Sequence, residues 1–425
     1  MSQLLQFSVC GIKNINKEIT INLAELSTKS VKKPNKVTAI FGFNGTGKTA
    51  LMTGIYIYKN VVINKYYLNQ LSTQKRLKKL CNLETKKIKV SLTFKGSDNK
   101  IFKHTIEIEN DLISKEIIEE LNNRTLNEKG TTIVKAEKGK VIESTFKDKV
   151  VNDRFNYIDC STNSIAFVYL AKIINEKTND LVTDKALDAF LTVLNFALNL
   201  EVQLQNSDLH HNSYLDLNSL DKTYELLKKE LLENESITSD DAIFEVSDKN
   251  FSLFKKRITK LERFIKIFKP DLIRIDIKDK NNGDKHNVNL VFVYGDDWLV
   301  DFEYESSGIK QLVSIFDNLL SLVNGKIVFI DEMDTNINSI YLEKLIEYFM
   351  NYGNGQLIFT THNIDAMNVL KNQSRSIVVV GDNSTAEVWV KKGYSNPINQ
   401  YKEGYFLNSP ACIEDFDFLK VFEAE

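Results

Sequence analysis

The stretch that decides the fold of this chain is GFNGTGKT, residues 42–49. It satisfies every fixed position of the phosphate-binding loop G-x-x-x-x-G-K-[S/T]. The expected context is present too, because KVTAIF (36–41) reads as a short apolar strand and residues 50–58 read as the start of an apolar helix. We therefore expect a nucleotide to bind at this loop.

Each residue type in the loop suits a bound phosphate. Glycines let the backbone turn tightly, so that successive N–H groups surround phosphate oxygens at a helix N-terminus. We expect the lysine to reach the β- and γ-phosphates, as part of the catalytic set, and the next threonine to ligate Mg²⁺. The alternative, a Gly-rich turn that binds nothing, is disfavoured by the flanking strand and helix. The predicted nucleotide-binding residues are Gly42, Asn44, Gly45, Thr46, Gly47, Lys48 and Thr49.

Length and composition set outer bounds. With 425 residues, 43% of them hydrophobic, the chain is long enough for one large domain with an insertion or for two or three smaller ones. Because 55 basic residues face 57 acidic ones, any nucleic-acid contact must come from a local patch. No stretch of 18 apolar residues and no leader pattern occurs, so we expect a cytoplasmic protein without membrane contact. Its cysteines lack C-x-x-C spacing and are expected to be free thiols: Cys10, Cys81, Cys160 and Cys412.

Two predicted strands precede the loop, at residues 4–10 and 17–23. A pair of N-terminal strands leading into G-x-N-G-x-G-K-T resembles the start of ABC-type ATPase heads of the SMC, RecF and OLD kind. Asn44 strengthens that resemblance. The resemblance implies an α/β fold, a P-loop ABC-type ATPase head with a mixed sheet, and it implies ATP and Mg²⁺ as the cofactors.

A second motif, KIVFIDE (326–332), is an apolar strand that ends in two carboxylates and matches the Walker B pattern. Adjacent charges at the end of a buried strand need a cation or a solvent cleft to offset desolvation, which disfavours a purely structural strand end. We predict that Asp331 holds the metal and that Glu332 polarises the attacking water. Asp334 is the candidate for the loop that senses an opposing protomer, although relatives often carry Leu-His-Pro where this chain has Thr335–Asn338.

Two further motifs resemble parts of ABC-type sites. ESSGIKQ (305–311) resembles a shortened ABC signature, in which Ser306, Ser307 and Gly308 open a helix and bind the γ-phosphate held by the other protomer. An ordinary helix cap is the alternative. QLIFTTH (356–362) resembles the strand that ends in the histidine switch, so His362 is the third catalytic candidate; a structural histidine is the alternative.

The remaining segments give the domain organisation. We predict an N-terminal lobe (1–163), a mainly helical insertion (164–268) and a C-terminal lobe (269–425). Within them we expect a hairpin near 131–144, helices at 187–202, 220–232 and 251–268, and strands at 272–277, 288–294, 298–304, 375–380 and 387–390. YIDCS (157–161) reads as a buried strand before a polar loop; since that loop lacks the expected glutamine, Ser161 or Asn163 is the candidate for its place.

Residues 59–89 carry nine Lys or Arg against one acid, Glu84. A solvated helix face is one interpretation. A contact surface for a phosphate backbone, with Tyr66 and Tyr67 interleaved, is the other.

OLD nucleases continue after the histidine strand with a metal-binding catalytic domain, whereas residues 363–425 show no Glu or D-x-D constellation on consecutive predicted strands. The resemblance therefore implies a Mg²⁺-dependent ATPase without an evident nuclease domain, working as a homodimer or higher homo-oligomer. It implies a sensor that controls a separate toxin or nuclease effector in bacterial anti-phage defence. A RecF-like DNA-repair clamp, with DNA at the 59–89 stretch, is the alternative, and a nuclease is the third hypothesis.

Overall fold

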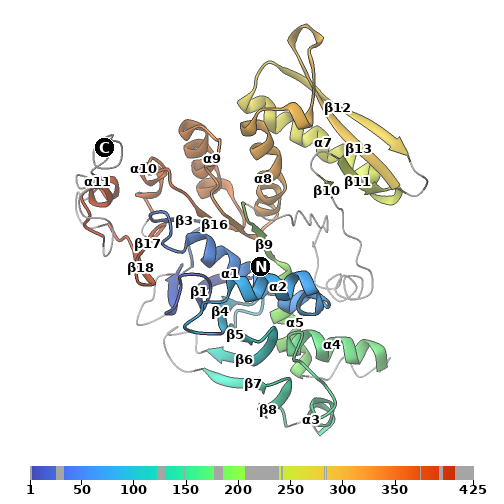
Figure 1. Cartoon of the computed structure of the whole chain (residues 1–425), viewed down its shortest axis with the longest axis vertical. Coiled ribbons are helices and arrows are strands. Elements are labelled where there is room, and N and C mark those ends of the chain that lie inside the picture. Colours follow the sequence, from blue (N-terminus) through green and yellow to red (C-terminus); the bar gives the residue numbers. More distant parts are fainter. Residues whose placement is uncertain are drawn as a thin grey trace, which may run out of the picture.

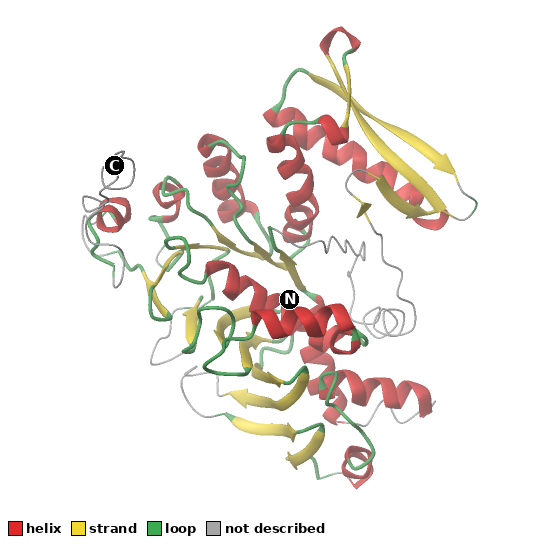
Figure 2. Ribbon diagram, in the orientation of Figure 1, coloured by secondary structure: helices red, strands yellow, loops and turns green. Residues whose placement is uncertain are grey.

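The structure is a computed structural model, in which the described residues are 2–24, 33–121, 130–147, 149–176, 185–205, 239–240, 243–281, 283, 285–373, 375–391 and 396–406. Their strands form three sheets. In the view of Figure 1 one sheet crosses the middle of the molecule, a second lies below it, and a third stands apart at the upper right. Figure 2 shows helices packed between and around the sheets.

The middle sheet has the order β18-β17-β3-β16-β15-β9 and carries the phosphate loop at the end of β3. Its strands run parallel except for β18, which is antiparallel at one edge. All residues of β3, β15, β16 and β17 are buried, as expected for parallel strands covered on both faces. The bounds are β3 Val37–Phe41, β9 Leu200–Gln203, β15 Ile327–Ile330, β16 Gln356–Thr360, β17 Ile377–Gly381 and β18 Thr385–Val388.

Helices cover both faces of this sheet, and the alternation of side chains along the strands assigns each face to one core. Phe329 belongs to the core that contains α1, whereas its neighbours Val328 and Ile330 belong to the core that contains α8, α9 and α10. The helix that follows the phosphate loop thus lies on the opposite face from the other three (Figure 1). The bounds are α1 Lys48–Ile63, α8 Ser307–Val323, α9 Ser339–Tyr352 and α10 Ala366–Leu370.

The second sheet is antiparallel and has the order β2-β1-β4-β5-β6-β7-β8. It shares one core with α1, so α1 is packed between two sheets. The strand bounds are β1 Gln3–Cys10, β2 Ile19–Asn22, β4 Ile88–Lys95, β5 Ile101–Glu109, β6 Leu112–Leu121, β7 Thr131–Glu137 and β8 Lys140–Ser144. The helices associated with it are η1 Tyr67–Asn69, α2 Leu71–Leu80, α3 Lys149–Phe155, α4 Ile165–Glu176 and α5 Lys185–Leu198.

The third sheet has the order β10-β11-β13-β12, with β14 also paired to β13, and α7 packs on it. An ion pair between Arg257 of α7 and Asp317 of α8 ties this lobe to the helices of the middle sheet. The bounds are β10 Ser239–Asp240, β11 Ile243–Ser247, α7 Asp248–Phe268, β12 Leu272–Asn281, β13 Lys285–Tyr294, η3 Gly295–Asp297, β14 Leu299–Asp301 and η4 Phe302–Tyr304.

The predicted α/β fold with a mixed sheet and N-terminal strands is confirmed, and so are the 131–144 hairpin and the 251–268 helix. The predicted 298–304 strand is only partly present, because Leu299–Asp301 is β14 and Phe302–Tyr304 is the 3₁₀-helix η4. Two further local predictions were wrong. YIDCS (157–161) is not a strand, because the Cys160 amide bonds to Gly139 and the Ser161 carbonyl to Ile113, outside any ladder.

The predicted 187–202 helix ends at Leu198, because Leu200–Gln203 pairs with β15 instead. The 220–232 helix lies outside the described residues, and the three-part domain division stays a prediction. Among the described helices, none is long and apolar enough to cross a membrane.

Candidate functional site

Three chain segments meet where parallel strands of the middle sheet end. β3 ends at the phosphate loop, β15 ends at Asp331 and Glu332, and β16 ends at Thr360. Because β16 lies between β3 and β15 and all three are parallel, their carboxyl ends lie at one edge. Sequence spacing alone located these motifs, and the sheet brings them together.

The phosphate loop has the backbone that its glycines predict. Gly47, the residue before α1, has φ 106°, in the left-handed region that favours glycine. A Cβ at Gly42 would lie 2.4 Å from the Val380 carbonyl oxygen, so a side chain there is excluded by β17. Asn44 and Gly45 are exposed at the loop tip, whereas Thr46 is buried and its hydroxyl donates to the Phe43 carbonyl at 3.0 Å.

Lys48 is buried at the start of α1 and its ammonium group points back into the loop. The Nζ atom donates to the carbonyl oxygens of Gly42 (2.8 Å) and Phe43 (3.0 Å). Burial lowers the pKa of Lys48, while the charges of Glu332, Asp331 and Asp334 oppose that change. The loop cation therefore lies in the field of the two Walker B carboxylates and of Asp334. Two carbonyl oxygens occupy the place where it would otherwise meet phosphate oxygens.

Asp331 is 2% exposed, and only one of its oxygens is satisfied. The Thr360 hydroxyl donates to Oδ1 at 2.6 Å, whereas Oδ2 is buried and makes no hydrogen bond within the described residues. Burial raises the pKa of this carboxyl, which the Thr360 bond and the nearby Thr49 hydroxyl partly offset. A buried carboxylate oxygen without a partner is costly unless something else binds it.

These residues fit Mg²⁺. Mg²⁺ is commonly bound by one or two protein oxygens plus phosphates and water, and the Thr49 hydroxyl and Asp331 Oδ2 supply such a pair. The part of the chain that the structure describes contains no group of three His, Cys, Asp or Glu side chains arranged for a metal ion. The metal would therefore depend on a bound nucleotide for its remaining ligands.

Glu332 has a strained backbone, with φ 48° at a non-glycine residue. Its amide donates to the Thr360 hydroxyl at 2.7 Å, so Thr360 holds both acids of the pair. The Thr335 hydroxyl donates to Glu332 Oε2 at 3.4 Å. Asp334 Oδ1 is a second buried carboxylate oxygen without a partner among the described residues. The buried carboxylate oxygens that lack a partner among the described residues thus both lie at this edge, beside a residue with a strained backbone.

His362 follows β16 and is exposed. The preceding Thr361 is buried, and its amide donates to the Ile40 carbonyl of β3 at 3.2 Å. The end of β16 is thereby aligned with the strand that carries the phosphate loop. His362 stays a prediction as a catalytic group.

Ser306 caps α8, since its hydroxyl accepts from the Ile309 amide at 3.4 Å. Ser306 and Ser307 are exposed. A Cβ at Gly308 would lie 2.9 Å from the Asn336 carbonyl oxygen, so this loop packs against the segment after Glu332. Among the described residues, no hydrogen bond joins Ser306, Ser307 or Gly308 to the phosphate loop of the same chain.

The sequence reasoning missed two glutamines near β9, the strand beside β15. Gln205 Nε2 donates to the Thr335 hydroxyl at 2.9 Å, which in turn donates to Glu332. Gln203 Nε2 donates to the Ser314 hydroxyl of α8 at 3.1 Å, and the backbone carbonyl of Gln203 accepts from the Asp331 backbone amide. The signal in the sequence is EVQLQ (201–205), which the helical reading of 187–202 concealed.

Ser161 and Asn163, proposed for the place of a glutamine, lie elsewhere. The Ser161 carbonyl accepts from Ile113 of β6, and the Asn163 amide donates to the Asn64 carbonyl beyond the end of α1. The structure does not favour either candidate, because after β3 the chain returns to the middle sheet at β9 and not at YIDCS (157–161).

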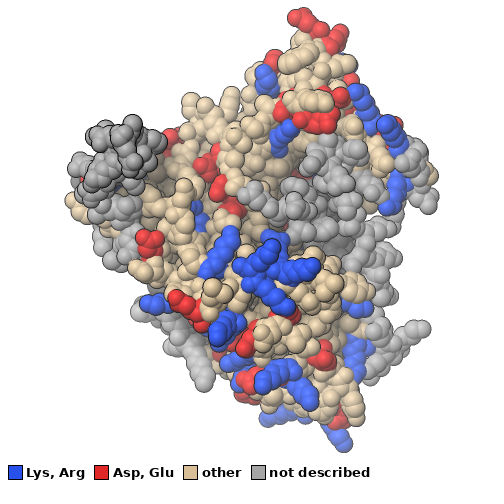
Figure 3. Space-filling view, in the orientation of Figure 1, with Lys and Arg blue, Asp and Glu red and all other residues tan. Residues whose placement is uncertain are grey.

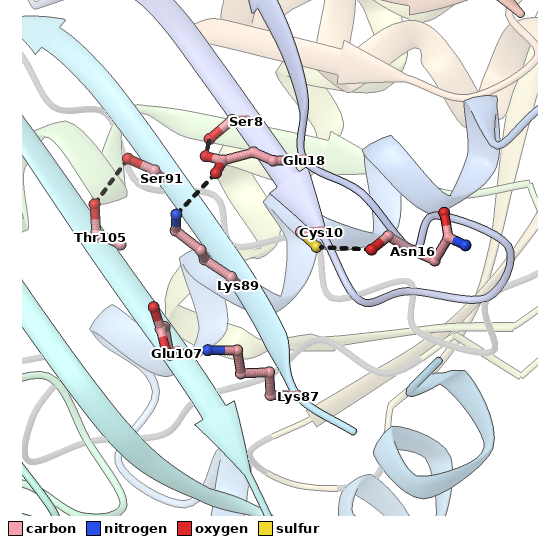
Figure 4. A network of polar contacts seen from close by, with 9 residues as sticks. All are labelled: Ser8, Cys10, Asn16, Glu18, Lys87, Lys89, Ser91, Thr105 and Glu107. Carbon is pink, nitrogen blue, oxygen red and sulfur yellow. Dashed lines mark hydrogen bonds and ion pairs between the residues drawn. The ribbon is translucent and has the colours of Figure 1, made fainter. Parts of the chain in front are cut away.

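The basic stretch 59–89 is partly neutralised by acids far away in sequence. Lys89 pairs with Glu18 at 2.8 Å, and Figure 4 shows Ser8 bonded to the same carboxylate and Lys87 beside Glu107. The other two pairs are Lys59 with Glu201 and Lys78 with Asp111. Within the described residues, no carboxylate pairs with four further lysines of this stretch, Lys65, Lys75, Lys79 and Lys86. Figure 3 shows basic side chains gathered over the region where Figure 1 places α2.

Comparison with known proteins gives one family match. The family model described as "AAA domain, putative AbiEii toxin, Type IV TA system" matches residues 37–368. That range includes the phosphate loop, Asp331, Glu332 and His362. No curated protein sequence matches the chain.

Similar solved structures include an SmcHead bound to the C-winged helix domain of ScpA, with 12% identity, coverage of 92% of this chain and 98% of that chain, and a TM-score of 0.43. The Smc head domain with a coiled coil and joint from Pyrococcus yayanosii has 14% identity, 96% and 100% coverage, and a TM-score of 0.43. The recombination mediator RecF with ATP has 10% identity, 92% and 98% coverage, and a TM-score of 0.41. These values describe a distant likeness.

Proposed function

The chain belongs to this AAA domain family, and from that premise we propose that it binds ATP with Mg²⁺ at the carboxyl edge of the middle sheet and hydrolyses it to ADP and phosphate. The observation that carries the proposal is Asp331 Oδ2, a buried carboxylate oxygen that has no hydrogen-bond partner among the described residues. Asp331 lies near the Thr49 hydroxyl and in the field of the Lys48 charge. An unsatisfied anion in this position is explained by a cation that arrives with the nucleotide.

In the proposed reaction each residue has one task. Lys48 leaves the Gly42 and Phe43 carbonyls and binds the β- and γ-phosphates. Thr49 and Asp331 would hold Mg²⁺, which when bound would neutralise charge on the phosphate oxygens. Glu332 orients a water and accepts its proton while the water oxygen bonds to the γ-phosphorus and the bond to the bridging oxygen breaks. His362 and Gln205 would contact the attacking water or the γ-phosphate from the two sides of Glu332.

The direct test is nucleotide binding by Lys48→Ala. Because the variant loses the loop's only side-chain cation, we expect the Kd for ATP to rise by about 100-fold or more. Titration with a fluorescent ATP analogue in the presence of Mg²⁺ measures it, with Lys65→Ala, at an exposed lysine beyond α1, as the matched control. Unchanged affinity of Lys48→Ala would remove the phosphate loop from the mechanism.

We further propose that two protomers complete each site. Supporting this, Ser306 and Ser307 are exposed at the N-terminus of the 17-residue helix α8, where backbone N–H groups favour an anion. In a two-fold pair each α8 would face the nucleotide of the other protomer. Mixing two inactive variants, Lys48→Ala and Ser307→Arg, forms one site with both defects and one with neither. We expect partial ATPase activity to return; heterodimers that stay inactive would contradict the shared site.

The biological role that we propose is control of a separate effector, a toxin or nuclease, in anti-phage defence. Its support is the resemblance to OLD-like ATPases together with the toxin–antitoxin system that the family's description names. Co-expression with each neighbouring gene, followed by co-purification and phage plating, tests it. We expect protection that requires both genes and is lost in Glu332→Gln; protection by this chain alone would contradict the two-component role.

One observation favours a RecF-like DNA clamp as a second candidate. The C-terminal end of α2, the helix that carries Lys75 and Lys79, is linked to the phosphate loop through residues 13–14. The Lys13 backbone amide donates to the Leu80 carbonyl, and the Asn14 side-chain amide donates to the Gly45 carbonyl. If this function holds, duplex DNA binds more tightly with ATP, and Lys75→Glu with Lys79→Glu abolishes binding, whereas Lys87→Glu, at a lysine already paired with Glu107, has a smaller effect.

A further inference from the structure

The phosphate loop has an aromatic residue, Phe43, that the loop motif does not require. Its ring stacks on Tyr401 with the planes 6° apart and the centroids 5.6 Å apart. Tyr401 belongs to α11 (Pro397–Lys402), a short helix close to the end of the described residues. A residue at the far end of the sequence therefore lies directly against the loop.

Contacts to the middle sheet hold α11 in this position. The Gln400 side chain accepts from Trp389 Nε1 at 2.8 Å, and the Trp389 amide bonds to the Ile377 carbonyl of β17. The Tyr401 ring also meets Phe41 of β3 at 6.5 Å and Phe406 at 6.1 Å. Burial raises the pKa of Tyr401 to about 12, so its hydroxyl stays neutral. The partly buried ring therefore packs against the core of this edge.

Phe43 in turn fixes the polar groups of the loop. Its carbonyl oxygen accepts from Lys48 Nζ at 3.0 Å, from the Thr46 hydroxyl at 3.0 Å and from the Thr46 amide at 3.4 Å. Two residues further along the loop, the Gly45 carbonyl accepts from the Asn14 side chain through Nδ2. The loop is thus held at its second and fourth residues by elements far away in sequence.

We propose that Tyr401 is a positioning residue for the phosphate loop, which it preorganises for the triphosphate by stacking on Phe43. This inference rests on the proposed ATP site. A glycine-rich loop loses much conformational freedom when it becomes ordered around a ligand, so an external contact that orders it beforehand lowers the cost of binding. Tyr401 acts on nucleotide affinity through Phe43, and it takes no part in the chemical step.

The test compares Tyr401→Ala, Tyr401→Phe and Tyr405→Ala. Tyr405→Ala is the matched control, because Tyr405 lies nearby in sequence but is 73% exposed. We expect Tyr401→Ala to raise the Kd for a fluorescent ATP analogue by about 3- to 10-fold, the range of one aromatic pair, while kcat at saturating ATP changes less than about 2-fold. Tyr401→Phe keeps the ring and should bind like the unmodified chain.

A double-mutant cycle with Phe43→Leu separates positioning from a general loss of structure. If Tyr401 acts through Phe43, the effects of Phe43→Leu and Tyr401→Ala on Kd are not additive. Additive effects, or a Tyr401→Ala variant that binds as tightly as Tyr405→Ala, would overturn the inference and leave the proposed function standing. If the unmodified chain fails to bind the analogue, the proposed function itself fails. If Tyr401→Ala does not fold, the Kd values of Phe43→Leu and Tyr401→Phe in the same titration decide the question. Only Phe43→Leu weakens the stack, so only this variant should bind the analogue less tightly.

Discussion

Buried polar side chains lie at both ends of α1. The two groups differ in whether their polar atoms have hydrogen-bond partners. Toward the C-terminal end, Tyr58 and Glu116 bond the two ring nitrogens of His104 at 2.8 and 2.9 Å. Glu116 also accepts from the Ser164 hydroxyl at 2.5 Å and from the Ile165 amide at 2.8 Å. At the N-terminal end, Lys48 bonds only loop carbonyls, while Asp331 and Asp334 each keep a buried oxygen without a partner in the described chain.

Whether buried polar atoms have hydrogen-bond partners distinguishes the structural cluster from the candidate functional site better than the extent of burial does. His104 and Asp331 are equally inaccessible, at 0% and 2% exposure. The His104 cluster completes its own hydrogen bonds and so stabilises the junction of α1, β5, β6 and α4. The Asp331 cluster is incomplete, and an incomplete buried anion is stable only if the rest of the fold offsets its cost until a ligand arrives.

The largest expected effect is on turnover in Glu332→Gln. The substitution keeps the shape of the side chain but removes the charge that accepts the proton of water, so kcat should fall by about 10²- to 10⁴-fold with ATP affinity nearly unchanged. Phosphate release at saturating ATP measures it, with Glu347→Gln on the exposed side of α9 as the control. Normal turnover would move the catalytic role away from this end of α1.

The next effect is on stability, and it belongs to the other end of α1. Glu116→Ala removes a partner from His104, Ser164 and the Ile165 amide at once, so the free energy of unfolding should fall by about 3 kcal/mol. Urea unfolding measures it against Glu119→Ala, a partly exposed acid on the same strand. If Glu116→Ala unfolds like the control, the completed network is not what stabilises this junction.

The smallest expected effect is on the stability of Asp331→Asn, and it does not share the destabilisation expected for Glu116→Ala. Asp331→Asn removes a buried charge that lacks a partner, so the nucleotide-free variant should be as stable as the unmodified chain or more stable, by up to about 1 kcal/mol. The extra stability that Mg²⁺ and ATP give the unmodified chain should be lost in the variant. Destabilisation like that of Glu116→Ala would erase the contrast between the two ends.

The same variant has a predicted pH dependence. Because burial raises the pKa of Asp331, the unfolded chain releases this proton at lower pH than the folded chain, and the folded state loses stability as pH rises between the two pKa values. The advantage of Asp331→Asn should therefore grow from the ordinary carboxyl range up to the raised pKa and stay constant above it. If the difference in the free energy of unfolding between Asp331→Asn and the unmodified chain became smaller as pH rises, the pKa of Asp331 would not be raised.

By itself the sequence determined the motifs whose residues are contiguous. GFNGTGKT (42–49) and KIVFIDE (326–332) each contain their own strand end and polar groups, so local spacing predicts both the element and the residues at its end. The N-terminal strands and the α7 helix were predictable for the same reason, because apolar periodicity is local.

Only the tertiary structure decided which distant residues join these motifs. β9 reads as the end of a helix until it pairs with β15, and that pairing puts Gln205 beside Thr335. The charge of 59–89 looked unopposed until the fold brought Glu18 and Glu107 against it, and nothing in the local pattern places Tyr401 on Phe43. Contacts of this kind depend on which surfaces are buried together, and a periodicity within a short window carries no information about a partner hundreds of residues away.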